Sequence, residues 1–283
     1  MMVMTIAVLM TCHNRVKKTL QCLDSLFAQK MQSSVNINVF LVDDGSTDDT
    51  AKAVRERFPH VKVLSGDGSL YWNRGMHLAF GEALKSGFDY YLWLNDDIML
   101  HEDALDVLIN LHLNLLQKGG AHSIIIASTK DPNTGEFTYG GYLQRGRFNP
   151  LKLKLIPPAD VPISCDAFCG NCVLIPKQVA EVVGNIDPAY QHRWGDVDYG
   201  LRAKASGCEI WVAPGYLADC ESNPMADQWK NPRLPLKKRL QELHSIKGLG
   251  KTDWWKFVRK HGGAFWLLNG IRPYLRILYD TIV

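Results

Sequence analysis

Two adjacent carboxylates follow a hydrophobic run in the first half of the chain. Asp96 and Asp97, preceded by Asn95, come directly after residues 90–94, which have the composition of a buried strand. In a parallel sheet, the last residues of a strand reach the carboxyl edge, where ligands of α/β proteins bind. Mg²⁺ or Mn²⁺ would offset the repulsion between the two carboxylates and take its other ligands from phosphate oxygens and water. The pattern favours a metal-assisted diphosphate site, and the alternative is that both carboxylates only stabilise the next helix.

A second pair of carboxylates, Asp196 and Asp198, lies in the stretch of residues 192–202. Because they are two residues apart, they cannot share one face of a helix, so one can project into a cleft while the other caps or supports the helix. Backbone N–H groups at a helix start can hold a carboxylate in place and leave an oxygen free for proton abstraction. The pair therefore supplies a candidate general base, with helix capping as the alternative.

Strand and helix signals alternate through the segment that leads to the first acidic pair. Ser46 and Asp49 have the spacing of a capping box at the start of one helix, which ends near Pro59. Apolar runs predict strands at residues 5–10, 37–42, 61–64 and 90–94, and helical signals lie between them at residues 20–27, 46–58 and 72–85. Four strands separated by three helices predict a largely parallel, doubly wound α/β sheet with right-handed crossovers.

The second half of the chain is less regular. Residues 105–116 carry a helical apolar stripe, residues 122–127 and 171–175 have strand composition, and a short helix is expected from Pro176. Residues 129–165 are rich in Gly, Pro and Lys, which predicts hairpins and loops around a substrate mouth.

The end of the chain has a different charge from the rest. Residues 1–229 carry 20 Lys and Arg against 26 Asp and Glu, whereas residues 230–283 carry 12 against 3. Within residues 237–283 these cations alternate with Trp, Phe and Tyr, a mixture that suits a helix in a membrane interface. The alternative is that the aromatic side chains pack against the catalytic domain or against a second subunit, which would make a homodimer.

No run of 18 uncharged apolar residues occurs, and the apolar start of the chain is typical of a first buried strand rather than a secretion signal. We therefore expect a cytoplasmic protein associated with the inner face of the cell membrane. The seven cysteines lack regular spacing, which favours reduced thiols. A zinc site at Cys165, Cys169 and Cys172 is disfavoured because no fourth ligand is evident.

Other function classes fit the sequence less well. A dehydrogenase needs a G-x-G-x-x-G loop after its first strand, and residues 10–15 contain no glycine. A nucleic-acid-binding protein could use the basic tail but would leave both acidic pairs without a role, so no nucleic-acid partner is expected. A catalytically silent scaffold remains an alternative, although the presence of both Asp97 and Asp196 argues against it.

Five separated motifs occur in this order: T-C-H-N-R at residues 11–15, L-V-D-D-G-S-T-D at 41–48, N-D-D at 95–97, F-C-G-N-C-V-L-I at 168–175 and W-G-D-V-D-Y-G-L-R at 194–202. Together they resemble family 2 glycosyltransferases, in particular the members that synthesise bacterial polysaccharides such as O-antigens. The resemblance covers residues 4–220 and implies the GT-A fold. It further implies a catalytic domain at residues 1–222, with a nucleotide-binding half at about 1–100 and an acceptor-binding half at about 101–222. A basic, aromatic helical extension would follow at residues 223–283.

The resemblance also implies roles for individual residues. Thr11 and Asp44 would contact the nucleotide base and ribose, with Asp43 supporting them. Asn95 and Asp96 would lie at the ribose-phosphate side, Asp97 would bind the metal, and Asp196 would be the general base. The residue before the base is often Glu in the family and is Gly195 here. Many relatives also place a His about twenty residues after the base, where this chain has no histidine. Either Asp219 substitutes for it, or the metal relies on Asp97 and phosphates alone.

Further positions are weaker candidates. Arg74 could meet a phosphate or be a solvated helix residue. Gly170 and Asn171 would let the donor sugar approach the backbone closely. Trp194 could stack on an acceptor sugar or simply pack, and His192 could bind the acceptor or be an ordinary surface residue.

A base and a metal on opposite faces of the anomeric carbon would give a single displacement with inversion. The expected donor is a UDP- or dTDP-sugar carrying a hexose or deoxyhexose. The expected acceptor is a hydroxyl of a glycan or of a polyprenol-linked sugar, in bacterial surface polysaccharide synthesis.

Overall fold

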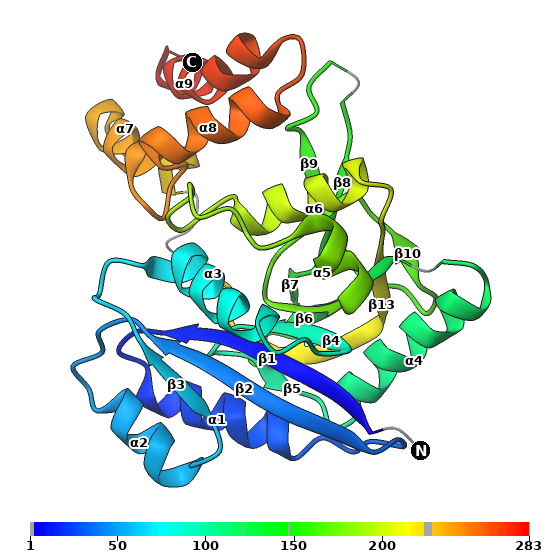
Figure 1. The fold of residues 1–283 in the computed structure, drawn as a ribbon. Helices are drawn as coiled ribbons and strands as arrows, with labels where there is room; N and C mark the ends of the chain where they lie inside the picture. The colour runs from blue at the N-terminus through cyan, green and yellow to red at the C-terminus, as the bar shows by residue number, and fades with distance from the viewer. Residues whose placement is uncertain (1–2, 121, 147, 224–227, 283) are drawn as a thin grey trace.

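The computed structural model describes residues 3–120, 122–146, 148–223 and 228–282. Its first half alternates strands and helices as the sequence predicts (Figure 1). The elements are β1 (Met4–Cys12), α1 (Val16–Phe27), β2 (Val35–Asp43), α2 (Thr50–Arg57), β3 (Lys62–Ser65), α3 (Tyr71–Leu84) and β4 (Tyr90–Leu94). Asn95, Asp96 and Asp97 therefore follow a strand, as expected.

The second half adds shorter strands and hairpins. Its elements are β5 (Met99–Leu100), α4 (Ala104–Gln117), β6 (Ser123–Lys130), β7 (Phe137–Tyr139), β8 (Gly141–Gln144), β9 (Leu153–Ile156), β10 (Ile163–Ser164), β11 (Ala167–Phe168), β12 (Cys172–Pro176), α5 (Lys177–Val183), α6 (Gly195–Ala205) and β13 (Glu209–Asp219). The predicted hairpin region, residues 129–165, contains the antiparallel pair β8 and β9.

The main sheet has the strand order β10-β13-β6-β12-β4-β1-β2-β3. Strands β3, β2, β1 and β4 are mutually parallel, which confirms the doubly wound prediction for this part. The strand β12 is antiparallel to both β4 and β6. Cys12 pairs with Asp43 in register, so β1 and β2 end together at the edge where ligands of such sheets bind.

Helices cover both faces of the sheet and bury alternate strand residues. In β1, Ile6 and Val8 contribute to the core under α1 and α4, whereas Ala7 and Leu9 contribute to the core under α3 and α5. Strands buried on both faces read as continuous apolar runs, which is why these segments are recognisable in the sequence. The core fixes the strand ends that carry the candidate site.

The predicted capping box at the start of α2 is wrong. Asp49 precedes the helix with φ 62°, a left-handed conformation, and its side chain makes no cap hydrogen bond. Asp48 accepts hydrogen bonds from the backbone N–H of Thr50 at 3.2 Å and of Val16 at 3.0 Å. The Oγ of Ser46 instead accepts from the backbone N–H of Asn14 at 2.9 Å. Asp48 thus joins the starts of α1 and α2.

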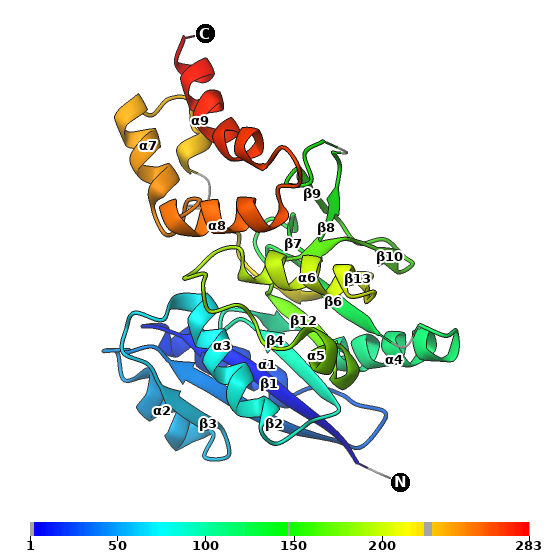
Figure 2. The same ribbon diagram turned by 45° about the horizontal axis from the view of Figure 1, so that its top comes forward.

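The extension contains α7 (Leu236–His244), α8 (Lys251–His261) and α9 (Trp266–Ile282), which lie over α6 (Figure 2). Trp254, Phe257 and Leu243 form a third core together with Tyr190 and Val197, which belong to the segment around α6. For these buried aromatic residues the packing alternative is therefore correct, whereas membrane contact by the exposed residues of the extension stays a prediction. Within the described residues, none of the helices is long and apolar enough to cross a bilayer.

Candidate active site

Asp44, at the end of β2, holds the loop that leads into α3. Its Oδ1 accepts the backbone N–H of Gly68 at 2.9 Å, and its Oδ2 accepts that of Tyr71 at 2.8 Å. A Cβ at Gly66 would lie 2.6 Å from Oδ1 of Asp44, so only glycine permits this approach. The neighbouring Asp43 accepts the backbone N–H of Ser46 at 3.0 Å. The two carboxylates shape the loops at the end of β2.

Thr11 lies close to these carboxylates, near the end of β1, and is buried. A Cβ added at Gly75 of α3 would lie 2.3 Å from the Oγ1 of Thr11, so α3 crosses directly over this residue. Arg74, the preceding residue of α3, donates from Nε to the carbonyl of Pro188 at 3.3 Å. Thr11 therefore faces α3, and Arg74 contacts the loop before α6 in this structure.

Arg15 pairs with both carboxylates that follow β4. Its Nη1 donates to Asp97 Oδ2 at 2.8 Å and to Asp96 Oδ1 at 3.1 Å. Asp96 is buried and also accepts from Thr19 Oγ1 at 3.3 Å. Burial raises the pKa of Asp96 to about 6, although the charge of Arg15 opposes this rise. Asp97 has 23% of its side chain exposed, so it is the carboxylate available to a ligand.

Sequence reasoning assigned no role to Arg15, although it included the residue in a motif. Arg15 comes three residues after β1 ends, and β1 lies beside β4 in the parallel part of the sheet. Adjacent parallel strands bring their carboxyl ends to the same edge, and this placement could have paired Arg15 with the acidic residues. The role of Arg15 could therefore have been found from the order of the strands in the sheet, but not from the residue types alone.

Trp72 connects the end of β4 to the loop before β12. Its Nε1 donates to Asn95 Oδ1 at 2.6 Å, and the backbone N–H of Asn95 donates to the carbonyl of Asn171 at 2.9 Å. A Cβ at Gly170 would lie 2.6 Å from the Trp72 ring and 3.2 Å from Cβ of Asp196. Gly170 is therefore required for the close approach of this indole and Asp196. Trp72 is a second residue to which sequence reasoning gave no role.

Asp196 lies in the first turn of α6, and backbone donors hold both of its oxygens. Oδ2 accepts the N–H of Gly170 at 2.9 Å, and Oδ1 accepts that of Val197 at 2.8 Å. Burial is the largest influence on its pKa and raises it above the ordinary value, while the two hydrogen bonds oppose the rise. A carboxylate with a raised pKa is a stronger proton acceptor.

Asp198 is fully buried and supports the helix instead. It accepts from Arg202 Nε at 2.8 Å, and Lys260 Nζ and His261 Nε2 each lie 2.7 Å from its Oδ1. Burial alone would raise the pKa of Asp198, but hydrogen bonds from His261, Lys260 and Arg202 hold it well below its usual range. The two carboxylates thus have different surroundings, with Asp198 in an ion-pair network that joins α6 to α8.

The two acceptor candidates, Trp194 and His192, have different surroundings. Trp194 stacks on Phe257 with ring centroids 4.5 Å apart, and its Nε1 donates to the carbonyl of Leu249 at 2.8 Å. The packing alternative is therefore the one that the structure supports for Trp194. Burial, together with the charges of Arg193 and Lys247, lowers the pKa of His192 to about 4, so this imidazole is neutral at pH 7.

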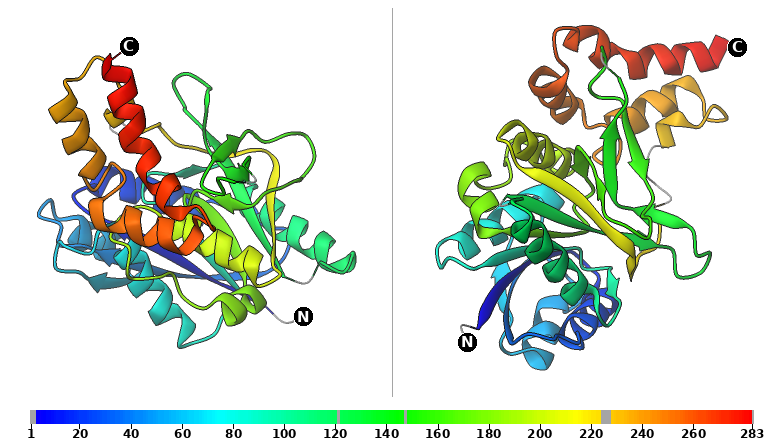
Figure 3. Two further views of the ribbon diagram at one scale, coloured as in Figure 1. Left: turned by 90° about the horizontal axis from the view of Figure 1, so that it is seen from above. Right: turned by 90° about the vertical axis from the view of Figure 1, so that its right-hand side faces the viewer.

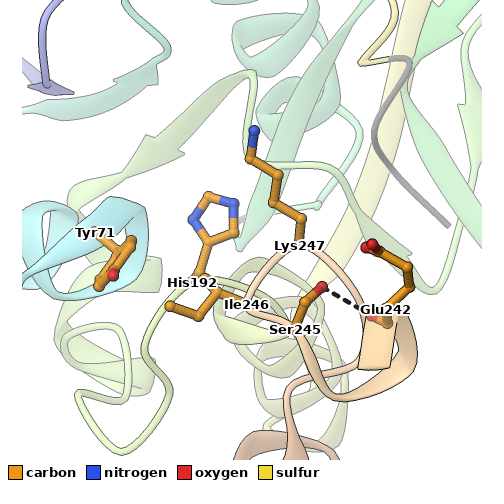
Figure 4. Close-up of a pocket in the computed structure, with 6 residues that line it drawn as sticks. All are labelled: Tyr71, His192, Glu242, Ser245, Ile246 and Lys247. Carbon is orange, nitrogen blue, oxygen red and sulfur yellow. Dashed lines mark hydrogen bonds between the residues drawn. The ribbon is translucent and has the colours of Figure 1, made fainter. Parts of the chain in front are cut away.

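His192 lines a cavity of about 350 Å³ between the start of α3 and the α7–α8 loop (Figure 4). The other lining residues are Tyr71, Glu242, Ser245, Ile246 and Lys247. The buried Nδ1 of His192 has no hydrogen-bond partner among the described residues. Tyr71 also donates its backbone N–H to Asp44, so the cavity adjoins the loop at the end of β2.

The residues available to a divalent cation are few. The described part of the chain contains no group of three or more His, Cys, Asp and Glu side chains arranged to hold a metal. Asp219 Oδ1 lies within hydrogen-bonding distance of His101 Nε2, at 3.3 Å, so the structure gives no support for its proposed substitution for the family's histidine. Cys165, Cys169 and Cys172 are buried free thiols. Asp97 alone, with donor phosphates and water, is a set of oxygen ligands that Mg²⁺ or Mn²⁺ accepts.

Comparison with known proteins identifies the family of the chain. Residues 7–182 match Glycosyl transferase family 2. The chain belongs to glycosyl transferase family 2. The α/β architecture with its mostly parallel sheet is accordingly the GT-A fold of this family, as predicted.

Among curated proteins, the chain is similar to N-acetylglucosaminyl-diphospho-decaprenol L-rhamnosyltransferase from two strains of Mycobacterium tuberculosis, CDC 1551 / Oshkosh and ATCC 25618 / H37Rv. Each is 23% identical over 202 residues, which cover 62% of this chain and 64% of the relative. The chain therefore spans a little under two thirds of the length of these relatives.

Proposed function

We propose that this family 2 glycosyltransferase moves a hexosyl or deoxyhexosyl group from a UDP- or dTDP-sugar to a hydroxyl of a lipid-linked glycan, with inversion, in bacterial surface polysaccharide synthesis. The observation that carries the proposal is the position of Asp196. Its pKa is raised, and it lies against Gly170, which Trp72 connects to Asn95 beside the Asp97 carboxylate. These contacts connect the proposed base to the end of β4, where Asp97 is the proposed metal ligand.

In this mechanism Asp196 removes the proton from the acceptor hydroxyl as that oxygen attacks the anomeric carbon. The hydrogen bonds from Gly170 and Val197 fix the carboxylate and leave it lone pairs for the proton. The new C–O bond forms on the face opposite the nucleoside diphosphate, whose bond to the anomeric carbon breaks. One displacement of this kind inverts the configuration.

The leaving diphosphate carries negative charge, and two groups at the end of β4 suit it. Asp97 would hold a divalent cation, which acts as a Lewis acid on phosphate oxygens when bound. Arg15 already lies 2.8 Å from Asp97 and can donate to the diphosphate from the same edge. Asn95, Asp96, Asp43, Asp44, Thr11, Arg74 and Asn171 are proposed to surround the nucleotide and its phosphates.

The acceptor assignment has two supports. The mycobacterial relatives are named for a diphospho-decaprenol-linked sugar as acceptor and L-rhamnose as the transferred group. In this chain, the cavity at His192 adjoins the Asp44 loop and is lined by Lys247 from the extension. We propose that this cavity receives the acceptor sugar. Residues 1–222 would form the catalytic domain, and residues 223–283 would supply part of the cavity wall. The protein would then work at the cytoplasmic face of the membrane.

The test is a screen of nucleotide-sugars for thermal stabilisation, with and without Mn²⁺, on the wild type, Asp97→Asn and the surface control Asp160→Asn. The proposal expects one donor to raise the melting temperature of the wild type and control in a Mn²⁺-dependent way, and Asp97→Asn to lose the Mn²⁺-dependent part. Nucleoside diphosphate release with acceptor would follow for the same donor. If no nucleotide-sugar binds, the proposal is wrong; if Asp97→Asn keeps the full Mn²⁺ effect, Asp97 is not the ligand.

A further inference from the structure

The helix α9 exposes a continuous apolar stripe. Its exposed apolar residues are Leu267, Leu268, Ile271, Leu275, Leu278 and Tyr279, with 61% of Leu268 and 65% of Tyr279 exposed. At about 100° per residue these positions fall within an arc of roughly 120° on one side of the helix. Isolated exposed apolar residues are common on protein surfaces, but a full-length stripe of this kind marks an interaction site.

The opposite side of α9 is fixed to the protein, so the stripe cannot turn inward. Ile277 is buried in the third core. Asn269 is buried and donates from Nδ2 to the carbonyls of Gly262 at 2.9 Å and Phe148 at 3.3 Å. A Cβ at Gly270 would lie 2.4 Å from the Trp255 ring, which shows how closely α9 approaches α8. The rotation of α9 is thus set by packing.

A second element extends the same surface. Phe265, which precedes α9, meets Phe148 in the loop between β8 and β9, with ring centroids 6.3 Å apart. Their exposed fractions are 50% and 68%. The hairpin rises beside the start of α9 (Figure 3). Two exposed aromatic rings therefore lie where the hairpin meets the start of α9.

Basic residues border this apolar surface. On α9, Arg272 and Arg276 are exposed beside one margin of the stripe. Both also line a hollow against the hairpin, and Arg276 Nε lies 3.8 Å from Asp280 Oδ2. On the hairpin, Arg145, Lys152 and Lys154 are exposed as well. A second copy of this chain would meet the surface with the same positive charges, which would repel. Anionic lipid headgroups complement them, and the acyl region just below accepts Leu, Phe and Tyr side chains.

We infer that the outer face of α9, together with Phe265 and Phe148, is a monotopic membrane-binding surface for anionic bilayers. The helix lies in the plane of the interface, with Leu268 and Leu275 in the acyl boundary and Arg272 and Arg276 at the headgroups. Since α8 packs against both α9 and α6, one helix layer separates the bilayer from the helix that carries Asp196. This surface is distinct from the reaction centre, and lipid binding does not depend on the proposed catalytic roles.

Vesicle flotation tests the apolar stripe. The full chain is mixed with phosphatidylcholine vesicles that contain roughly a quarter phosphatidylglycerol, a composition that gives a negative surface. The wild type should float with these vesicles, and Leu268→Gln/Leu275→Gln should lose roughly tenfold or more in affinity, since two apolar side chains no longer enter the acyl region. The matched control Val161→Gln/Val182→Gln changes two residues that are as exposed, 65% and 52%, elsewhere on the surface and should bind as the wild type does.

A second pair of variants tests the charge. Arg272→Gln/Arg276→Gln should keep the wild-type melting temperature but lose most of the preference for anionic over pure phosphatidylcholine vesicles. The inference is overturned if the wild type does not float, or if the stripe variant floats as well as the wild type. Size-exclusion chromatography gives a further outcome that overturns the inference. If the wild type is a dimer, Leu268→Gln/Leu275→Gln is a monomer, and neither protein binds vesicles, the face is a protein interface.

Discussion

Asp196 and Asp198 lie two residues apart, and yet their pKa values are shifted in opposite directions. Burial raises the pKa of Asp196, whereas the hydrogen bonds from His261, Lys260 and Arg202 lower that of Asp198. Pairs of carboxyl groups whose surroundings separate their pKa values in this way are typical of sites that divide chemical and structural roles. At the scale of the residue, the difference assigns Asp196 to proton transfer and Asp198 to support.

This difference predicts a pH dependence. A base acts when deprotonated, so sugar transfer should fall as the pH falls through the raised pKa of Asp196, and the acid limb should lie above about 3.9, the ordinary value for Asp. The kcat/KM profile measured between neutral and acid pH checks this. An acid limb that persists in Asp196→Asn would belong to another group.

At the scale of the element, α6 and α8 are joined by one buried carboxylate. Asp198→Asn removes the charge that Arg202, Lys260 and His261 share. We expect the free energy of unfolding to fall by about 3 kcal/mol, near the lower end for a broken buried pair because Arg202 and Lys260 are partly exposed. Since the pKa of Asp198 is lowered, this stability is present above about pH 4 and is lost as the pH falls further. Urea unfolding, with Asp160→Asn as the exposed control, measures it; an unchanged midpoint would show that the network contributes nothing.

Elements with regular periodicity were predictable from the sequence. The first four strands and three helices follow the apolar pattern, because strand and helix periodicity is a local property. The capping of α2 was not predictable. Ser46 and Asp49 have the spacing of a capping box, but the backbone at Asp49 is left-handed and its side chain makes no cap hydrogen bond. In the extension, composition did not reveal that Trp254 and Phe257 face inward while Leu268 and Leu275 face outward.

At the scale of the whole molecule, the candidate site is assembled by contacts between distant segments. Arg15 with Asp97, Trp72 with Asn95, and Asp198 with His261 each join residues far apart in sequence. Such contacts depend on strand order and on the docking of the extension, which a single sequence does not encode locally. The roles of the individual donor-binding residues therefore stay predictions.

The third core gives a prediction for the extension. Deleting residues 253–283 removes Trp254 and Phe257, which cover Trp194 and Tyr190. The truncated protein should therefore aggregate or unfold rather than remain a soluble transferase. Expression followed by size-exclusion chromatography and circular dichroism decides the matter. A folded, monomeric truncation that still hydrolyses the donor would show that the extension is only an anchor.

The most direct test of the account is the rate of sugar transfer by Asp196→Asn, measured with donor affinity on the same preparation. The amide preserves the shape of the side chain but cannot accept the acceptor's proton, so turnover should fall by about 10²- to 10⁴-fold while donor affinity stays near the wild-type value. Transfer at nearly the wild-type rate would contradict the assignment of Asp196 as the base, and loss of donor binding would show that the carboxylate has a structural role instead.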